Sequence, residues 1–219
     1  MIDNYWLGRW ERDEIGFHQD QVNPYLVTFW ETLHLPAHSS VFVPLCGKSQ
    51  DMVWLQNRGH SVLGVELSEL AIKTFFQENN TAPIHQTAAK FECFSADRLQ
   101  ILQGDFFDLE QKDLNTVAAV YDRASLVALP PETRRRYVHH ITQTLPAGTQ
   151  ILLIGFDYPQ TEMQGPPYAV SPDEIRQLYQ DHADIRLLKQ VDVLDDNPRF
   201  QQRGLSRLQE SVFLSNIRQ

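Results

Sequence analysis

The stretch VFVPLCGKSQDMVWLQNRGHSVLGVE, residues 41–66, decides the fold. A run of β-branched and aromatic residues is broken by a turn at Gly47, continues as an apolar helical segment and ends in a second apolar strand. The last residue, Glu66, lies about 20 residues past the first turn, where nucleotide-binding β–α–β units carry an acid that accepts hydrogen bonds from ribose hydroxyls. The stretch therefore predicts a binding site for an adenosine-type cofactor.

The turn PLCGKS, residues 44–49, discriminates between three cofactors. A phosphate-binding P-loop needs G-x-x-x-x-G-K-[ST], but Phe42 occupies the position of its first glycine. A dinucleotide fingerprint needs G-x-G-x-x-G so that the backbone can approach a pyrophosphate, and this turn holds one glycine. A cofactor without a pyrophosphate suits the turn better, and S-adenosylmethionine is the common one. The residues thus favour a methyltransferase over a nicotinamide-dependent oxidoreductase.

Composition narrows the class of protein. A chain of 219 residues with 42% hydrophobic residues is most simply one domain, expected over residues 1–219, with a helical segment at 1–35 covering the active site. The net charge of −9 argues against nucleic acid or an anionic membrane as the main partner. The sequence shows neither a signal peptide nor a run of about 20 apolar residues. Cys46 and Cys93 are expected to be reduced thiols in the cytoplasm.

The rest of the chain alternates strand-like and helix-like segments, which predicts a mainly parallel sheet with helices on both faces. No helix-length spacer separates the last two strands, so they are expected to form an antiparallel hairpin. Residues 79–98 read as polar and irregular, with a possible short strand at 91–94. The expected strands are 41–45, 61–65, 99–103, 117–121, 150–156, 185–193 and 208–214, and the expected helices are 25–35, 68–76, 130–145 and 172–180.

Ligands of such sheets bind beyond the carboxyl ends of the strands, where the strand order reverses. Four segments are therefore expected to meet at the site. They are residues 45–47, Glu66, residues 104–106 and residues 122–123.

Several separated motifs resemble the thiopurine S-methyltransferase family, especially its bacterial members. They are IGFHQ at 15–19, PLCGKS at 44–49, GHSVLGVELSEL at 59–70, YDR at 121–123 with LVA at 126–128, and GPPY at 165–168. The resemblance implies a Rossmann-like class I methyltransferase fold. It also implies methyl transfer from S-adenosylmethionine to the sulfur of small aromatic or heterocyclic thiols such as thiopurines, as a detoxification activity. Methylation of selenium or tellurium species is the alternative that bacterial members suggest.

The resemblance also implies site residues. Phe17 is expected to face the acceptor, and either Arg199 or Arg203 is expected on the substrate side, because the spacing of NPRFQQRG departs from the family pattern. The cofactor contacts that the resemblance implies are Trp10, Leu45, Glu66, Asp105, Phe106 and Arg123.

Methyl transfer to a thiol depends more on the positions of the two reacting groups than on proton transfer. A heterocyclic thiol is partly ionised at neutral pH, so no strong general base is required, and Phe17 and His18 are expected to position the acceptor. Cys46 is read as a packing residue, and Lys48 and Asp51 as residues that shape the turn. No metal site is expected, since the adjacent His139 and His140 cannot share one helix face.

The expected partner is a small-molecule thiol, and the expected assembly a monomer. A non-catalytic sensor of an adenosine ligand and a nicotinamide-dependent oxidoreductase are the competing classes of function.

Overall fold

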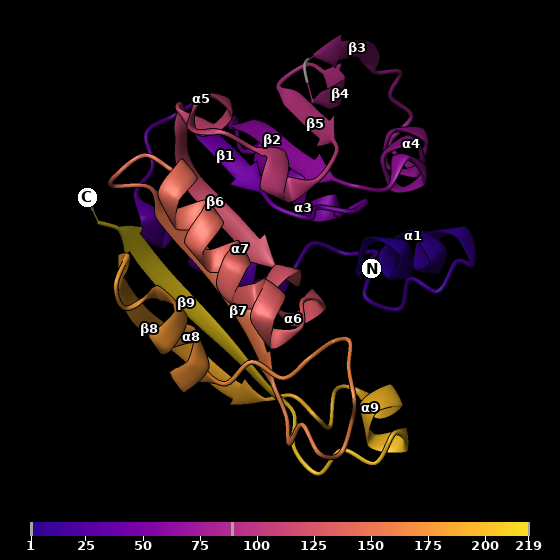
Figure 1. Ribbon diagram of the computed structural model, residues 1–219, viewed down its shortest axis with the longest axis vertical. Coiled ribbons are helices and arrows are strands. Elements are labelled where there is room, and N and C mark those ends of the chain that lie inside the picture. Colours follow the sequence, from indigo (N-terminus) through magenta and orange to yellow (C-terminus); the bar gives the residue numbers. More distant parts are fainter. Residues whose placement is uncertain (1, 89, 219) are drawn as a thin grey trace. The chain divides into compact units, whose positions relative to one another are not determined.

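The computed structural model describes residues 2–88 and 90–218 (Figure 1). The chain forms two compact units, residues 1–121 and residues 122–219. The boundary follows Tyr121, inside the strand β6. Each unit has its own set of paired strands.

The first unit contains a sheet with the strand order β3-β4-β5-β2-β1-β6. Its parallel part pairs β1 with β2 and β6, and β2 with β5, whereas β4 pairs antiparallel with β5 and with β3. The parallel strands confirm the pattern expected for a nucleotide-binding sheet. The bounds are β1 Ser40–Val43, β2 Ser61–Glu66, β3 Ile84–Ala88, β4 Phe91–Ala96, β5 Leu99–Gln103 and β6 Val117–Arg123.

The possible short strand at 91–94 is confirmed as part of β4, but the expectation that the rest of residues 79–98 is irregular was wrong. This segment forms the hairpin β3–β4, in which Ile84 pairs with Ser95 and Ala88 with Phe91. All five residues of β3 are exposed. Apolar alternation, which reveals a half-buried strand, is therefore missing from β3.

Two helices of the first unit, α3 and α4, begin at serine caps. Ser49 accepts from the Asp51 backbone at the start of α3, and Ser68 accepts from the Ala71 backbone at the start of α4. The helix expected at residues 25–35 is shorter, because α2 ends at Phe29 and a 3₁₀ turn follows. The bounds are α1 Ile2–Glu11, α2 Pro24–Phe29, η1 Trp30–Leu33, α3 Gln50–Asn57, α4 Glu69–Glu78, η2 Phe106–Asp108 and α5 Gln111–Leu114.

The second unit is built on three antiparallel strands in the order β7-β9-β8. The antiparallel pairing expected for the last two strands is confirmed, and β9 also pairs along its length with β7. The strands are β7 Gln150–Asp157, β8 Ala183–Asp192 and β9 Gln209–Ile217, and the helices are α6 Ser125–Ala128, α7 Pro131–Thr144, α8 Pro172–Tyr179 and α9 Pro198–Gln202.

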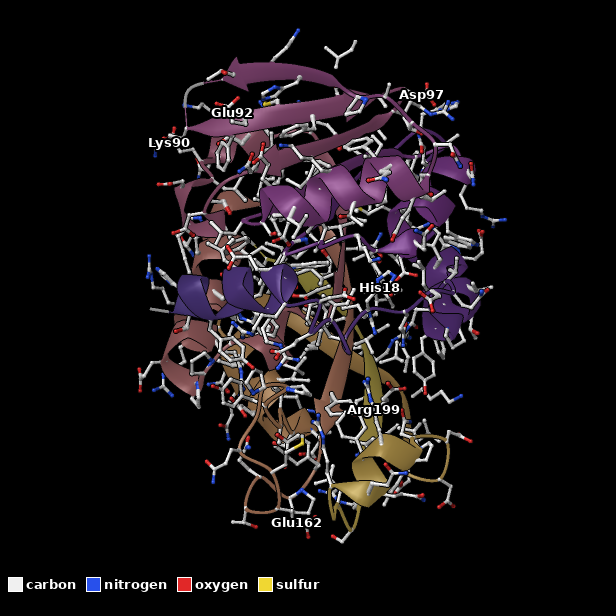
Figure 2. The ribbon with its side chains drawn as sticks, turned by 90° about the vertical axis from the view of Figure 1, so that its right-hand side faces the viewer. His18, Lys90, Glu92, Asp97, Glu162 and Arg199 are labelled. Carbon is white, nitrogen blue, oxygen red and sulfur yellow. The ribbon has the colours of Figure 1, made fainter. Side chains whose placement is uncertain are left out.

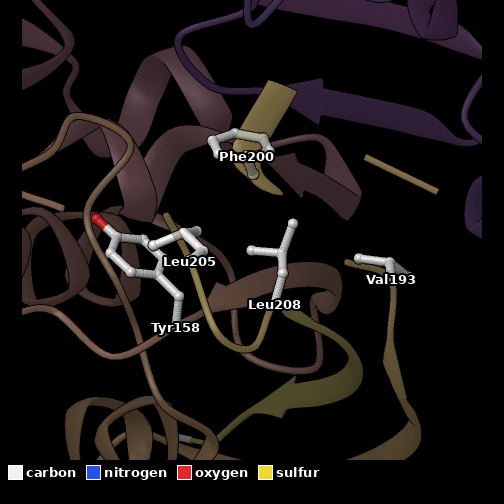
Figure 3. Packing of buried hydrophobic residues seen from close by; sticks show 5 residues of the cluster. All are labelled: Tyr158, Val193, Phe200, Leu205 and Leu208. Carbon is white, nitrogen blue, oxygen red and sulfur yellow. The ribbon is translucent and has the colours of Figure 1, made fainter. Parts of the chain in front are cut away.

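One apolar cluster of the second unit holds the segment around α9. Figure 3 shows its five buried members, and Phe200 contributes the aromatic ring of α9. The burial of Phe200 fixes the short helix that carries Arg199. The members are Tyr158, Val193, Phe200, Leu205 and Leu208.

None of the helices formed by residues 2–88 and 90–218 has the length and apolar character needed to cross a membrane.

Candidate functional site

Glu66 is a buried acid held at the carboxyl end of β2. Its Oε2 accepts from the Gly47 N–H at 2.9 Å, and its Oε1 accepts from the Ser68 N–H at 2.8 Å. Burial raises the pKa of Glu66, and hydrogen bonds from the backbone of Ser68, Gly47 and Leu67 oppose that rise. Because a carboxylate has about four lone-pair sites, Glu66 can accept from a ligand while it stays bound to the backbone.

The turn between β1 and α3 is tightly shaped. Leu45 has φ +46°, in the left-handed region that non-glycine residues rarely adopt, and Gly47 has φ +52°. A Cβ on Gly47 would lie 3.1 Å from Cζ2 of Trp10, so the indole packs directly on the turn. Gly47 is therefore required both by its backbone conformation and by the close approach of Trp10.

Two residues with different expected roles contact each other in the first unit. The rings of Trp10 and Phe17 meet edge to face, with centroids 5.5 Å apart, and Trp6 meets Phe17 in the same way at 5.4 Å. Trp10 is 8% exposed and Phe17 is half-buried. This aromatic cluster thus links the residue expected at the cofactor, Trp10, to the residue expected at the acceptor, Phe17.

His18 follows Phe17 and is labelled in Figure 2. Its Nε2 lies 3.4 Å from Oδ1 of Asp20, and its backbone N–H donates to the Ile15 carbonyl at 2.7 Å. These contacts hold the chain next to Phe17 in a compact turn, which is the contribution expected of a positioning residue.

The pair expected at the adenine follows β5, the neighbour of β2 in the sheet. The Gly104 N–H donates to the backbone carbonyl of Glu66 at 3.0 Å, which places this turn beside the buried acid. Asp105 is exposed, and its Oδ1 accepts from the Phe107 N–H at 2.9 Å, whereas Phe106 is buried. Backbone groups and the Phe106 ring are the features of this turn that can contact a base.

The remaining polar residues of the turn make structural contacts. Lys48 is buried, and its Nζ lies 2.6 Å from Oε1 of Glu78 at the end of α4. Burial, followed by the charge of Glu66, raises the pKa of Cys46 well above its ordinary value, so the thiol stays neutral. These positions agree with the expectation that Cys46 packs and that Lys48 shapes the turn.

Arg123 ends β6 and lies in the second unit. Its neighbour Asp122 is 1% exposed and accepts from the Tyr137 hydroxyl at 2.6 Å. Burial raises the pKa of Asp122 to about 6, although hydrogen bonds from Tyr137 and Ser125 oppose the rise. The Asp122 carboxyl thus accepts from the hydroxyls of Tyr137 and Ser125 and from the Ser125 backbone, all in its own unit.

The two candidate substrate-side arginines flank the ring of Phe200. Arg199, labelled in Figure 2, has its guanidinium carbon 4.8 Å from the ring centroid, and the distance for Arg203 is 5.7 Å. Partial loss of water, followed by repulsion from Arg203 and Arg123, lowers the pKa of Arg199. Arg203 also places Nη1 3.7 Å from the Met163 sulfur. The charges of Arg203 and Arg123 both act on Arg199.

The GPPY loop is bound to its surroundings in the second unit. The Tyr158 hydroxyl donates to the Pro167 carbonyl at 2.5 Å, and the Tyr168 N–H donates to the Val127 carbonyl at 2.7 Å. Gln160 adds a bond from its amide to the Met163 carbonyl at 2.6 Å. The loop is therefore held by a set of specific bonds.

The residues of the first unit fit an adenosyl cofactor. A buried acceptor, Glu66, lies beside a single-glycine turn that a Cβ would fill, and the apolar Phe106 lies in the next turn. In the described part of the chain, no group of three or more His, Cys, Asp or Glu side chains is arranged to hold a metal ion.

Sequence reasoning found Glu66, because its place after an apolar strand is a recognisable signal. It did not find the partners of Asp51, which accepts from the Asn23 N–H and the Tyr121 hydroxyl, each at 2.8 Å. These partners are 28 and 70 residues away along the chain, so local pattern carries no trace of them.

Known proteins resemble this chain over its whole length. The family model "Thiopurine S-methyltransferase (TPMT)" matches residues 1–217. A thiopurine S-methyltransferase of Nitrosospira multiformis is 58% identical over 214 residues, covering 98% of this chain and 97% of the relative. One of Azotobacter vinelandii is 48% identical over 213 residues, covering 97% and 98%.

A solved structure shows the same fold. The 1,6-didemethyltoxoflavin-N1-methyltransferase of Burkholderia thailandensis, bound to 1,6-didemethyltoxoflavin and S-adenosylhomocysteine, is similar with a TM-score of 0.67 at 15% identity, covering 100% of this chain and 88% of that one. The Rossmann-like methyltransferase fold expected from the sequence is confirmed by this similarity. The family match and the two relatives show that the chain belongs to the thiopurine S-methyltransferase family.

Proposed function

We propose that this chain transfers a methyl group from S-adenosylmethionine to the sulfur of small aromatic or heterocyclic thiols such as thiopurines. The observation that carries the proposal is the geometry at Glu66 in a member of this family. A buried carboxylate, fixed by two backbone N–H groups, lies next to a turn on which an aromatic cluster packs. That arrangement supplies both a ribose acceptor and an apolar wall.

Each cofactor-binding residue would contact a different part of S-adenosylmethionine. When bound, S-adenosylmethionine supplies a methyl group on a positively charged sulfur. Glu66 would accept from the ribose hydroxyls, and Phe106 would offer an apolar face to the base, with Asp105 beside it. The guanidinium of Arg123 would bind the carboxylate of the methionine part, a pairing that its fork of N–H donors favours.

Trp10 and Leu45 would flank the cofactor from the N-terminal segment and the turn. The Trp10 ring is already in place on Gly47, so its position does not have to be set by a ligand. An aromatic face is also a favourable neighbour for a positively charged sulfur.

Phe17 would face the acceptor and keep water away from its sulfur, with His18 holding the chain beside it. Removing water from a thiolate and a sulfonium favours the reaction, because both charges vanish as the methyl group moves. Arg199 would attract a heterocyclic thiolate, because an anion would relieve the repulsion that Arg199 receives from Arg203 and Arg123.

We further propose that residues 1–219 act as one methyltransferase domain, with residues 1–35 covering the active site, as a monomer in the cytoplasm. The family match over residues 1–217 supports a single functional unit. The two cysteines are free and buried, as expected of a protein that stays in a reducing compartment. The net charge of −9 supports a small-molecule partner over nucleic acid.

Calorimetry with S-adenosylmethionine and a thiopurine assay that measures S-adenosylhomocysteine test the proposal. Glu66→Gln is expected to raise the cofactor Kd by about tenfold or more, because its amide N–H₂ would oppose a backbone N–H donor. Glu132→Gln makes the same change at an exposed site and should leave binding unaltered. No cofactor binding by the intact protein would refute the proposal.

Two outcomes separate the competing functions. Binding without turnover on any thiol of a panel would identify a sensor. Volatile selenium or tellurium products with no thiopurine turnover would favour the metalloid reaction.

A further inference from the structure

We infer that Asp51 is a positioning residue for the proposed methyl transfer, on which this inference rests. Asp51 lies in the first turn of α3 and is 2% exposed. Its carboxylate joins the N-terminal segment that carries Phe17 to the cofactor turn and to strand β6. The residue is not expected to touch either substrate, so its effect on the reaction is indirect.

Each carboxylate oxygen of Asp51 is held by a different segment of the first unit. Oδ1 accepts from the Asn23 backbone N–H at 2.8 Å, and Oδ2 accepts from the Tyr121 hydroxyl at 2.8 Å. The Asp51 N–H in turn donates to Oγ of Ser49 at 3.2 Å. One buried side chain therefore connects three segments that are remote in sequence.

Each of these segments carries a residue of the candidate site. The Asn23 side chain donates from Nδ2 to Oε1 of Gln19 at 3.1 Å, and Gln19 comes two residues after Phe17. Asp51 itself comes four residues after Gly47. Tyr121 precedes Arg123 by two residues in the same strand.

The carboxylate suits this connecting role better than other side chains of its size. Burying a charge is costly unless hydrogen bonds replace water, and an apolar residue would pack here without that cost. An asparagine offers a single oxygen, so it could accept from Asn23 or from Tyr121 but not from both. Only a carboxylate of this length accepts from both donors at once.

The two hydrogen bonds to the Asp51 carboxylate can be removed separately. Tyr121→Phe deletes the hydroxyl that donates to Oδ2 and keeps the ring. Asn23→Pro deletes the N–H that donates to Oδ1, and the Asn23 φ of −61° is the value that proline adopts. Because Asn23 also caps α2 through Tyr25, Asn23→Ala is the matched control that loses the cap and keeps the N–H.

Steady-state kinetics and calorimetry on the full chain test the inference. Relative to Asn23→Ala, Asn23→Pro should raise the KM for the thiol about tenfold and change the cofactor Kd much less. Tyr121→Phe should raise the cofactor Kd, and Asp51→Ala should show both effects. Asp51→Asn should recover only part of the activity lost in Asp51→Ala, because its single oxygen can accept from one of the two donors.

Loss of stability alone is excluded by a second control. Thr142→Val removes a buried hydroxyl that donates to the Val138 carbonyl at 2.8 Å, so it should lower Tm without altering KM or Kd. The inference is overturned if Tyr121→Phe and Asn23→Pro fold, lower Tm as Thr142→Val does, and leave the KM for the thiol and the cofactor Kd unchanged.

Failure of the proposed function is distinguishable from failure of this inference. A wild-type protein without methyltransferase activity contradicts the function. Amide hydrogen exchange over residues 17–23 then still tests the connection, since it should accelerate in Asp51→Ala and stay slow in Thr142→Val. Unchanged exchange in Asp51→Ala would count against the connection itself.

Discussion

Asp122 is a carboxyl whose ionisation weakens the fold. It is 1% exposed, and burial raises its pKa from 3.8 to about 6. The substitution Asp122→Asn keeps the shape of the side chain and removes the charge. Its amide oxygen can accept from the Tyr137 hydroxyl as the carboxyl does at 2.6 Å, and the Ser125 hydroxyl can turn to accept from the amide. The Ser125 backbone N–H, which also donates to Asp122, cannot turn in this way, so the full electrostatic gain is an upper bound.

The direction in which stability changes with pH follows from proton binding by Asp122. Because the folded protein binds the Asp122 proton more tightly than the unfolded chain, wild-type stability from this group is complete below pH 3.8 and is lost as pH rises through about 6. The shift of about 2 pH units corresponds to about 3 kcal/mol at neutral pH. Asp122→Asn should therefore be more stable than wild type at pH 8 by up to about 3 kcal/mol, or about 6–12 °C in Tm.

Urea unfolding at several pH values measures this difference. The advantage of Asp122→Asn should fall to about half its full value at pH 5 and vanish toward pH 3.8. Asp181→Asn, at an exposed carboxyl, should shift stability by less than about 0.5 kcal/mol at every pH. An advantage that is independent of pH, or a variant less stable than wild type at pH 8, would refute the reasoning.

Two further predictions concern the turn and the substrate side. Gly47→Ala should lower the unfolding free energy by about 1–2 kcal/mol and weaken cofactor binding, because it adds backbone strain and displaces Trp10. The control is Gly148→Ala, which adds backbone strain at φ +81° but has open space around its Cβ. If both variants changed the cofactor Kd equally, the role of the Trp10 contact would be contradicted. Arg199→Ala should raise the KM for an ionised heterocyclic thiol more than Arg203→Ala does, measured by steady-state kinetics at pH 8, and the reverse order would assign the substrate side to Arg203.

The sequence predicts a strand correctly where one or both faces of that strand are buried, because the buried positions are then apolar. The strand β5, Leu99–Gln103, was predicted with its observed bounds, because three of its five residues are buried and apolar and the run ends at Gly104. The strand β3, Ile84–Ala88, was missed for the opposite reason. It is exposed throughout and is stabilised by pairing with β4, including a stacked contact between His85 and Phe94 with ring centroids 4.5 Å apart.

The candidate site also has features that the sequence predicts and features that it does not. Glu66 is predictable because its role depends on local order, an apolar strand followed by an acid. The geometry that fixes it is not predictable, because the Gly47 N–H reaches it across 19 residues. The choice between Arg199 and Arg203 was open in the sequence, since both lie beside Phe200 on one short segment. In the structure their guanidinium carbons differ in distance to the Phe200 ring, 4.8 Å for Arg199 and 5.7 Å for Arg203.

The strand order of the second unit has a consequence for how the chain acquires its structure. Strand β9, Gln209–Ile217, lies between β7 and β8, although both precede it in the sequence. During synthesis from the N-terminus, β8 therefore has no partner strand, and β7 keeps one open edge, until β9 has been made. The interval is a window for aggregation or chaperone binding, and it closes when β9 inserts and pairs with both neighbours.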